Sequence, residues 1–280
     1  MEPHAHPPPA SGYAPGFVQR VLDDALMAGV RCYGIAGLQG SGKTTLAHQV
    51  AALAARGGRA VVVLSIDDFY LDQPRRKALA RDVHPLLATR GPPGTHDVAL
   101  ACAVLDALRD GLSVPLPRFD KLADRRLAEH AWPASGRADL VLLEGWFNQV
   151  PPEDRAELAA PCNALEREED PQGTWRAYCN DALGRDYPRL WQRIDRALFL
   201  QPPGFNVVPG WRWQQECTLQ AAHPGRTAMD ETQVGRFVQH FERVSRQALC
   251  TLPALVDTVV QLDPLRRPLA WRGRPTAPRS

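Results

Sequence analysis

Residues 37–44 read Gly-Leu-Gln-Gly-Ser-Gly-Lys-Thr, which satisfies the phosphate-binding loop pattern G-x-x-x-x-G-K-[ST] in full. Glycines let such a loop curl until successive backbone N–H groups point at phosphate oxygens, and the following helix adds the positive end of its dipole. The flanks fit this geometry, because 32–36 is a short apolar strand candidate and 44–56 has helical character ending at two glycines. The pattern therefore predicts a strand–loop–helix unit that binds a nucleoside triphosphate.

The residues of this loop have expected parts in nucleotide binding. Lys43 supplies a mobile cation to the β- and γ-phosphates, and the Thr44 hydroxyl is placed to bind Mg²⁺. The nucleotide-binding residues predicted from the sequence are Gly37, Leu38, Gln39, Gly40, Ser41, Gly42, Lys43, Thr44 and Thr45.

The rest of the chain alternates between apolar runs and helical patterns. Helical spacing is found at 17–26, 98–108 and 233–249. The apolar runs with the length and residue types of buried strands are 32–36, 60–66, 140–143, 194–200 and 256–262. Continuous apolar strands that alternate with helices are typical of a parallel sheet covered on both faces. We therefore predict an α/β fold of the P-loop NTPase type, with a parallel five-stranded sheet.

The same patterns divide the chain into a core and its appendages. Residues 17–263 are predicted to form one nucleotide-binding domain. Within it, 151–192 is a polar insertion with helical pieces, interrupted by prolines and packed against the core. Residues 1–16, rich in proline and histidine, are expected to be a disordered tail, and 264–280 a basic, proline-rich tail.

Composition restricts the classes of partner. With 33 basic and 31 acidic residues, the chain lacks the broad positive charge of a nucleic-acid-binding protein. No apolar run reaches membrane-spanning length, and the first 16 residues lack the apolar core of a signal peptide. The six cysteines are scattered without metal-ligand spacing, as in a reduced cytoplasmic protein. We expect a cytoplasmic protein without nucleic-acid or membrane partners, whose oligomeric state the sequence leaves open.

Acidic residues follow two of the predicted strands. The carboxyl ends of parallel strands meet at one edge of a sheet, where ligands bind. Glu144 comes directly after an apolar run, as a Walker B acid does, and would hold Mg²⁺ or its water; otherwise it faces solvent. Asp67 and Asp68 are adjacent, so they point to opposite sides, and one of them could be a general base. Both could instead begin a turn.

Three further segments have two interpretations each. Asp97 is either the N-cap of the next helix or a substrate ligand presented by the constrained loop 90–96. The loop 117–121 places two cations and a carboxylate together, which also suits a solvated turn. Arg212 lies in an aromatic patch at 211–216, where it could contact transferring phosphates, while the tryptophans could simply pack on a helix face.

Taken together, these segments resemble the phosphoribulokinase/uridine kinase/pantothenate kinase group of P-loop kinases, and within it the D-glycerate 3-kinase family. The resemblance covers about residues 17–263 and is carried by 37–45, 65–71, 90–97, 117–121, 143–146 and 211–216. Its most specific element is Arg-Gly-Pro-Pro-Gly-Thr-His-Asp at 90–97.

The resemblance implies roles for residues that the patterns alone leave open. Asp67 matches the catalytic aspartate of the motif Ser-x-Asp-x-Phe-Tyr, and Asp97 matches a position that contacts the acceptor hydroxyl. Residues of about 203–226 match a lid, with Arg212 or, in its place, Arg226 as its phosphate-contacting arginine. The implied activity is ATP- and Mg²⁺-dependent phosphorylation of D-glycerate to 3-phosphoglycerate. The acceptor carboxylate then needs a cation, for which Arg90, Arg118 and Lys121 are candidates, and Tyr70 lies beside them in the acceptor site.

Two alternatives remain at this point. The acceptor could be pantothenate, a nucleoside or another sugar acid, because the insertion after Trp146 does not map onto the family. The chain could instead be a GTPase-like switch or a nucleotide-binding regulator. A switch would need a guanine-specifying Asn-Lys-x-Asp segment, and none of the three lysines, Lys43, Lys77 and Lys121, lies in one.

Overall fold

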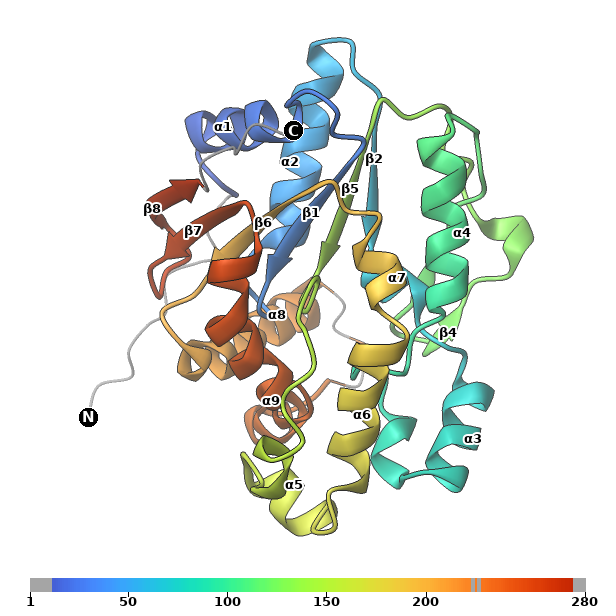
Figure 1. Ribbon diagram of the computed structural model, residues 1–280, viewed down its shortest axis with the longest axis vertical. Coiled ribbons are helices and arrows are strands. Elements are labelled where there is room, and N and C mark those ends of the chain that lie inside the picture. The colour runs from blue at the N-terminus through green and yellow to red at the C-terminus, as the bar shows by residue number, and fades with distance from the viewer. Residues whose placement is uncertain (1–11, 223–224, 226–227, 274–280) are drawn as a thin grey trace.

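A computed structural model describes residues 12–222, 225 and 228–273 of the protein. Its central sheet has the strand order β2-β5-β1-β6-β7-β8 (Figure 1). The strands are β1 (Cys32–Gly37), β2 (Val61–Ser65), β5 (Leu140–Gly145), β6 (Arg196–Gln201), β7 (Thr258–Leu262) and β8 (Pro268–Gly273). The first five in spatial order run parallel, and β8 pairs antiparallel with β7. The five predicted parallel strands and the P-loop NTPase fold are confirmed.

The sixth strand, β8, corrects the prediction of five strands and of a tail that starts at 264. The chain reverses after β7 because the Asp263 carboxylate accepts hydrogen bonds from the N–H groups of Leu265 and Arg267, both at 2.8 Å. No residue of β8 is fully buried, so the strand lacks the apolar run by which the others are recognised. Residues 274–280, the rest of the predicted tail, lie outside the described residues.

The N-terminal boundary also differs from the prediction. Helix α1 (Pro15–Ala25) begins inside the segment expected to be a tail, with proline in its first turn. Tyr13 is buried, and its backbone N–H and C=O are both bonded to the Gln49 side chain, at 2.9 and 3.0 Å. The folded chain therefore starts before residue 17, while residues 1–11 lie outside the described part.

Helices cover both faces of the sheet, as predicted. Alternate strand residues point to opposite faces, so Leu140 and Leu142 of β5 pack with α1 and α2 (Lys43–Arg56), in one apolar cluster. Val141 and Leu143 belong to the second cluster, on the opposite face, with α4 (Val98–Arg109) and α9 (Glu231–Leu255). Among the described residues no helix is long and apolar enough to cross a membrane.

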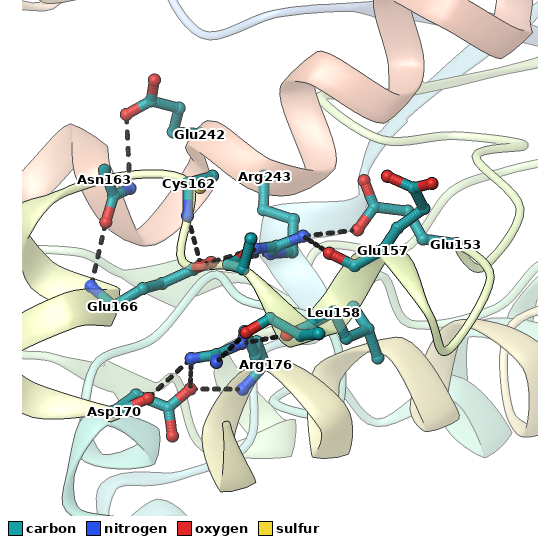
Figure 2. A network of polar contacts seen from close by, with 12 residues as sticks. Glu153, Glu157, Leu158, Cys162, Asn163, Glu166, Asp170, Arg176, Glu242 and Arg243 are labelled. Carbon is teal, nitrogen blue, oxygen red and sulfur yellow. Dashed lines mark hydrogen bonds and ion pairs between the residues drawn. The ribbon is translucent and has the colours of Figure 1, made fainter. Parts of the chain in front are cut away.

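The insertion after β5 is held on α9 by buried charge. It contains α5 (Ala164–Glu169), α6 (Thr174–Arg185) and α7 (Pro188–Trp191). Arg243 of α9 pairs with Glu166 at 2.7 Å and with Glu153 at 2.9 Å (Figure 2). Within the insertion, buried Arg176 and Asp170 pair at 3.1 Å. Because Glu166 and Asp170 are fully buried, this network makes the insertion an integral layer of the domain.

The remaining elements gather near the carboxyl ends of the strands, at the lower end of the sheet in Figure 1. They are α3 (Gln73–Asp82), the hairpin of β3 (Phe119–Asp120) and β4 (Arg125–Arg126), and α8 (Val208–Ala222), which lies within the predicted lid segment. Arg226, at the end of that segment, lies outside the described residues. A 3₁₀ turn, η1 (Ile66–Phe69), directly follows β2. These elements surround the end of the sheet at which the phosphate loop lies.

Candidate active site

The phosphate loop joins β1 to α2 and has the curled backbone that the glycines predict. Gly40 and Gly42 have φ angles of +77° and +87°, a region that residues with a side chain rarely adopt. Space is also limiting, because a Cβ atom on Gly40 would lie 2.6 Å from the Cβ of Trp211 on α8. Both conformation and packing therefore require glycine at residue 40.

Lys43 begins α2 and lies across the loop. Its side chain is buried, and its Nζ donates to the backbone oxygen of Leu38 at 3.0 Å. Burial lowers the pKa of the Lys43 ammonium, and the Glu144 and Asp67 carboxylates counteract that effect. An ammonium held in this way lies where a triphosphate in the loop would meet it.

Thr44 and Glu144 form a hydrogen-bonded pair beside the phosphate loop. Glu144 is the penultimate residue of β5, and its Oε1 accepts a hydrogen bond from the Thr44 hydroxyl at 2.9 Å. Both residues line the same cavity. Hydroxyl and carboxylate oxygens are the ligands that Mg²⁺ prefers, usually with phosphate oxygens and water completing its shell. The pair therefore fits a divalent ion bound together with a nucleotide.

The two adjacent aspartates after β2 have different environments. Asp67 points into the cavity, where its Oδ2 pairs with the Lys121 ammonium at 2.6 Å. Burial alone would raise the pKa of Asp67, but Lys121 and a hydrogen bond from Tyr70 outweigh it and lower the pKa to about 2. Asp68 instead pairs with Arg118 at 3.1 Å, and burial raises its pKa. Only Asp67 of these two is available to a ligand in the cavity.

The cavity has a volume of about 560 Å³ and lies among the phosphate loop, the strand ends, α8 and α9. The described cations that line it are Lys43, Arg90, Lys121, Arg212 and Arg266, and the acids are Asp67 and Glu144. This lining carries more positive than negative groups, which suits anionic ligands.

Arg90 and Lys121 lie together at the Asp67 end of the cavity. The Arg90 guanidinium pairs with Asp124 at 2.6 Å and donates to the backbone oxygen of Lys121 at 3.1 Å. Asp124 also pairs with Arg76 of α3 at 2.6 Å, so α3 and the β3–β4 hairpin hold both cations in place. The arrangement places Lys121 beside the carboxylate of Asp67 and Arg90 next to Lys121 in the same cavity lining.

Two predicted substrate residues, Asp97 and Arg118, are not among the described residues that line the cavity. Asp97 is the N-cap of α4, where its carboxylate accepts from the N–H of Leu100 at 3.2 Å and pairs with Arg75 at 3.0 Å. Arg118 pairs with Asp68. The capping interpretation of Asp97 is therefore correct, and acceptor contact by these two residues remains a prediction.

Arg212 lies on α8 and lines the cavity, as the lid prediction requires. Its guanidinium pairs with buried Glu216 one turn later, at 3.1 Å, and lies 5.8 Å from the centre of the Phe237 ring of α9. Helices α8 and α9 thus line the cavity together with Asp67 of η1 and Lys121 of the hairpin.

Comparison with known proteins identifies the family. The uncharacterized kinase mug58 of Schizosaccharomyces pombe is 34% identical over 220 residues, which cover 74% of this chain and 77% of that protein. The chloroplastic D-glycerate 3-kinase of Arabidopsis thaliana is 29% identical over 233 residues, which cover 79% of this chain but 48% of the plant protein. This chain belongs to a family of P-loop kinases that includes mug58 and has D-glycerate 3-kinases among its relatives.

The family assignment agrees with the fold. The structure of D-glycerate 3-kinase from Cryptococcus neoformans aligns over 92% of this kinase and 97% of that chain, with a TM-score of 0.73 and 24% identity. No family model matches the sequence. The kinase is an ATP-dependent phosphotransferase with an alcohol group as acceptor, as predicted, and its relatives imply ATP and a divalent metal ion as cofactors.

Sequence reasoning missed several residues that line the cavity of this kinase. Phe237 and Phe241 come from α9, and Gln214 from α8. Gln214 lies inside the aromatic patch that drew attention to Arg212, so that patch could have indicated it. Tyr13 and Arg266 come from the segments predicted to be tails, where no motif marks them.

Proposed function

We propose that this kinase transfers the γ-phosphoryl group of ATP to a hydroxyl group of D-glycerate, giving 3-phosphoglycerate. The observation that carries the proposal is that one cavity joins the phosphate loop to Asp67 and to the paired cations Arg90 and Lys121. The names of the plant and fungal relatives support the same acceptor. The six cysteines are unpaired, as in a reducing compartment, and we place the activity in the cytoplasm.

On the donor side, the loop amides and Lys43 bind the β- and γ-phosphates. Thr44 and Glu144, whose side-chain oxygens lie 2.9 Å apart, would hold Mg²⁺ directly or through a water. When bound, the metal neutralises phosphate charge as the bond to the leaving oxygen breaks. Arg212 reaches the transferring phosphoryl group from α8 when residues of about 203–226 act as a lid.

On the acceptor side, Asp67 accepts the proton of the attacking hydroxyl. An aspartate with a pKa of about 2 is a weak base, and phosphoryl transfer tolerates this because its transition state is loose and depends mainly on positioning. An acceptor carboxylate competes with Asp67 for the Lys121 ammonium, which lies 2.6 Å from Asp67 without ligand. Binding of the acceptor thus raises the pKa of Asp67 before this carboxylate accepts the hydroxyl proton.

The cations suit an acid better than a neutral sugar. Arg90 and Lys121 bind the carboxylate, and the Tyr70 hydroxyl holds Asp67 in orientation. Asp97 and Arg118 are the further candidates for acceptor contact, although they lie outside the described cavity lining: Asp97 caps α4, and Arg118 pairs with Asp68 beside Asp67.

A nucleoside is the second candidate acceptor, because the same cavity has aromatic walls on which a base could stack. These walls are Tyr70, Trp146, Phe237 and Phe241. A nucleoside would bring no carboxylate to Arg90 and Lys121, which pair only with Asp124 and Asp67 among the described residues, so D-glycerate is the better match. A regulator without an acceptor would have no use for Asp67 beside the phosphate loop.

The variant Asp67→Asn tests the assignment of the acceptor side. We expect kcat with D-glycerate to fall by about 10²–10⁴-fold, the range for loss of a general base, while the Kd for ATP stays within about threefold of wild type. Asp68→Asn is the matched control, because Asp68 is adjacent but outside the cavity lining. An Asp67→Asn enzyme with wild-type turnover would remove Asp67 from the mechanism.

A further inference from the structure

The phosphate loop has two backbone carbonyls that are bound by side chains from the two ends of the chain. A trans peptide is planar, so the C=O of one residue points opposite to the N–H of the next. The Ser41 N–H, opposite to the Gly40 carbonyl, donates to the Leu38 backbone oxygen at 3.2 Å and closes the turn of the loop, while the Gly42 N–H points opposite to the Ser41 carbonyl. Groups that hold those two carbonyls therefore fix both peptide planes and with them the direction of the Gly42 N–H.

Tyr13 holds the Ser41 carbonyl. Its hydroxyl donates to the Ser41 backbone oxygen at 2.6 Å, and its ring lies against Gly42, where an added Cβ would be 3.1 Å from the hydroxyl. Gln49 of α2 bonds the Tyr13 backbone on both sides, so the ring is fixed to the helix that follows the loop. Burial raises the pKa of Tyr13, which keeps its hydroxyl a donor at neutral pH.

Arg266 holds the Gly40 carbonyl. Its Nε donates to the Gly40 backbone oxygen at 2.5 Å, and its Nη2 donates to the Gln214 side chain of α8 at 2.9 Å. The guanidinium lies 4.9 Å from the centre of the Trp211 ring, whose Nε1 donates to the Pro264 backbone oxygen at 2.8 Å. The loop, α8 and the turn before β8 are thus joined at this one side chain.

The backbone of Arg266 is in a strained conformation. Its φ is +65°, a left-handed conformation that is uncommon for residues other than glycine. The turn places the side chain over the loop at the expense of local strain, and such strain gathers at functional sites.

We propose that Tyr13 and Arg266 are positioning residues of the nucleotide site. They fix the peptide planes 40–41 and 41–42, which holds the turn closed by the Ser41 N–H and directs the Gly42 N–H toward the phosphates before a nucleotide arrives. Arg266 in addition ties the loop to α8, the helix that carries Arg212. This inference concerns nucleotide binding alone and does not depend on which acceptor the kinase uses.

Two variants test the proposal by nucleotide binding, measured calorimetrically with ADP and ATP in the absence of acceptor. Tyr13→Phe removes one oxygen, and Arg266→Gly removes the guanidinium while suiting the positive φ. We expect Kd to rise about three- to tenfold for Tyr13→Phe, and about ten- to a hundredfold for Arg266→Gly, whose lost donor is charged. ADP and ATP should be affected alike, because both carry the phosphates that the loop binds.

A purely structural role would give a different result. We expect the unliganded melting temperature of both variants to stay close to that of wild type, while the increase in melting temperature caused by ADP becomes smaller. Arg267→Ala is the matched control, since that exposed neighbour pairs with Asp263 and not with the loop, and its Kd should not change. If Arg266→Gly lowers the melting temperature of the protein without ligand, the nucleotide Kd of Tyr13→Phe alone tests the proposal. Wild-type nucleotide Kd values in Tyr13→Phe and in a stably folded Arg266→Gly would overturn the proposal.

Discussion

Replacing Lys121 by methionine tests the coupling between the acceptor cation and the catalytic carboxylate. The substitution keeps the length of the side chain and removes its charge. In the wild type the ammonium is 2.6 Å from Asp67 and is the main group that lowers the pKa of that carboxyl, against the effect of burial. Without it, burial is left to raise the pKa, so Asp67 should become protonated at a higher pH.

The size of this effect follows from the geometry. The pKa of Asp67 lies at about 2 instead of its ordinary 3.8, and this difference corresponds to about 2.5 kcal/mol at about 1.36 kcal/mol per unit. The Lys121 side chain is 56% exposed, so solvent screens the pair and the interaction is reduced to about 1–2 kcal/mol. We therefore expect the pKa of Asp67 to rise by about 0.7–1.5 units in Lys121→Met.

Two measurements follow this change. Titration of the Asp67 carboxyl by NMR reports its pKa in the protein without acceptor, and the pH dependence of kcat/KM reports it in catalysis. At neutral pH, KM for D-glycerate should also rise about 10- to 100-fold, because the acceptor carboxylate loses a charged donor. Lys77→Met is the matched control, since Lys77 is exposed on α3. An unchanged Asp67 titration together with an unchanged KM in Lys121→Met would show that Lys121 neither lowers the pKa of Asp67 nor binds the acceptor.

Three further predictions concern the metal, the fold and pH. Thr44→Val removes only the hydroxyl that contacts Glu144, and the concentration of Mg²⁺ needed for half-maximal activity should rise about tenfold; an unchanged requirement would remove Thr44 as a ligand. Glu166→Gln leaves the Arg243 charge underpaired in a buried network, so the free energy of unfolding should fall by about 3 kcal/mol and the melting temperature by about 6–12 °C. A loss of unfolding free energy below about 1 kcal/mol would show that the network is dispensable for stability. Burial lowers the pKa of His96 and of His240 from 6.5 to about 4, so the unfolded chain binds more protons between these values. Stability should therefore fall as the pH is lowered from 6.5 toward 4, by about 2 kcal/mol for each histidine at pH 5, which denaturant titrations at pH 7 and pH 5 would measure.

The sequence predicts those parts of the fold that depend on local periodicity. The phosphate loop and the five parallel strands have strong local signals, and the structure has them within a few residues of the expected bounds. Helix α3 was missed because it lacks an apolar stripe: its one buried residue is Arg76, which is held by Asp124 from the hairpin. Strand β8 was missed because an edge strand with exposed side chains has no apolar run.

The candidate site was predictable where a motif fixes a residue on a strand end. Lys43, Thr44, Asp67 and Glu144 meet in one cavity because parallel strands end at a common edge. Tyr13 and Arg266 were not predictable, since their roles depend on contacts with a loop 28 and 226 residues away in sequence. Such contacts arise from tertiary packing and leave no periodic pattern.

The central claim is that this kinase phosphorylates a small hydroxy acid, and an acceptor screen tests it most directly. Wild-type protein is incubated with ATP and Mg²⁺ and with D-glycerate, pantothenate or uridine, and ADP release is followed by a coupled assay. We expect rapid ADP release with D-glycerate, with 3-phosphoglycerate as the product identified by ³¹P NMR. A higher kcat/KM with pantothenate or uridine, or ADP release that no acceptor stimulates, would contradict it.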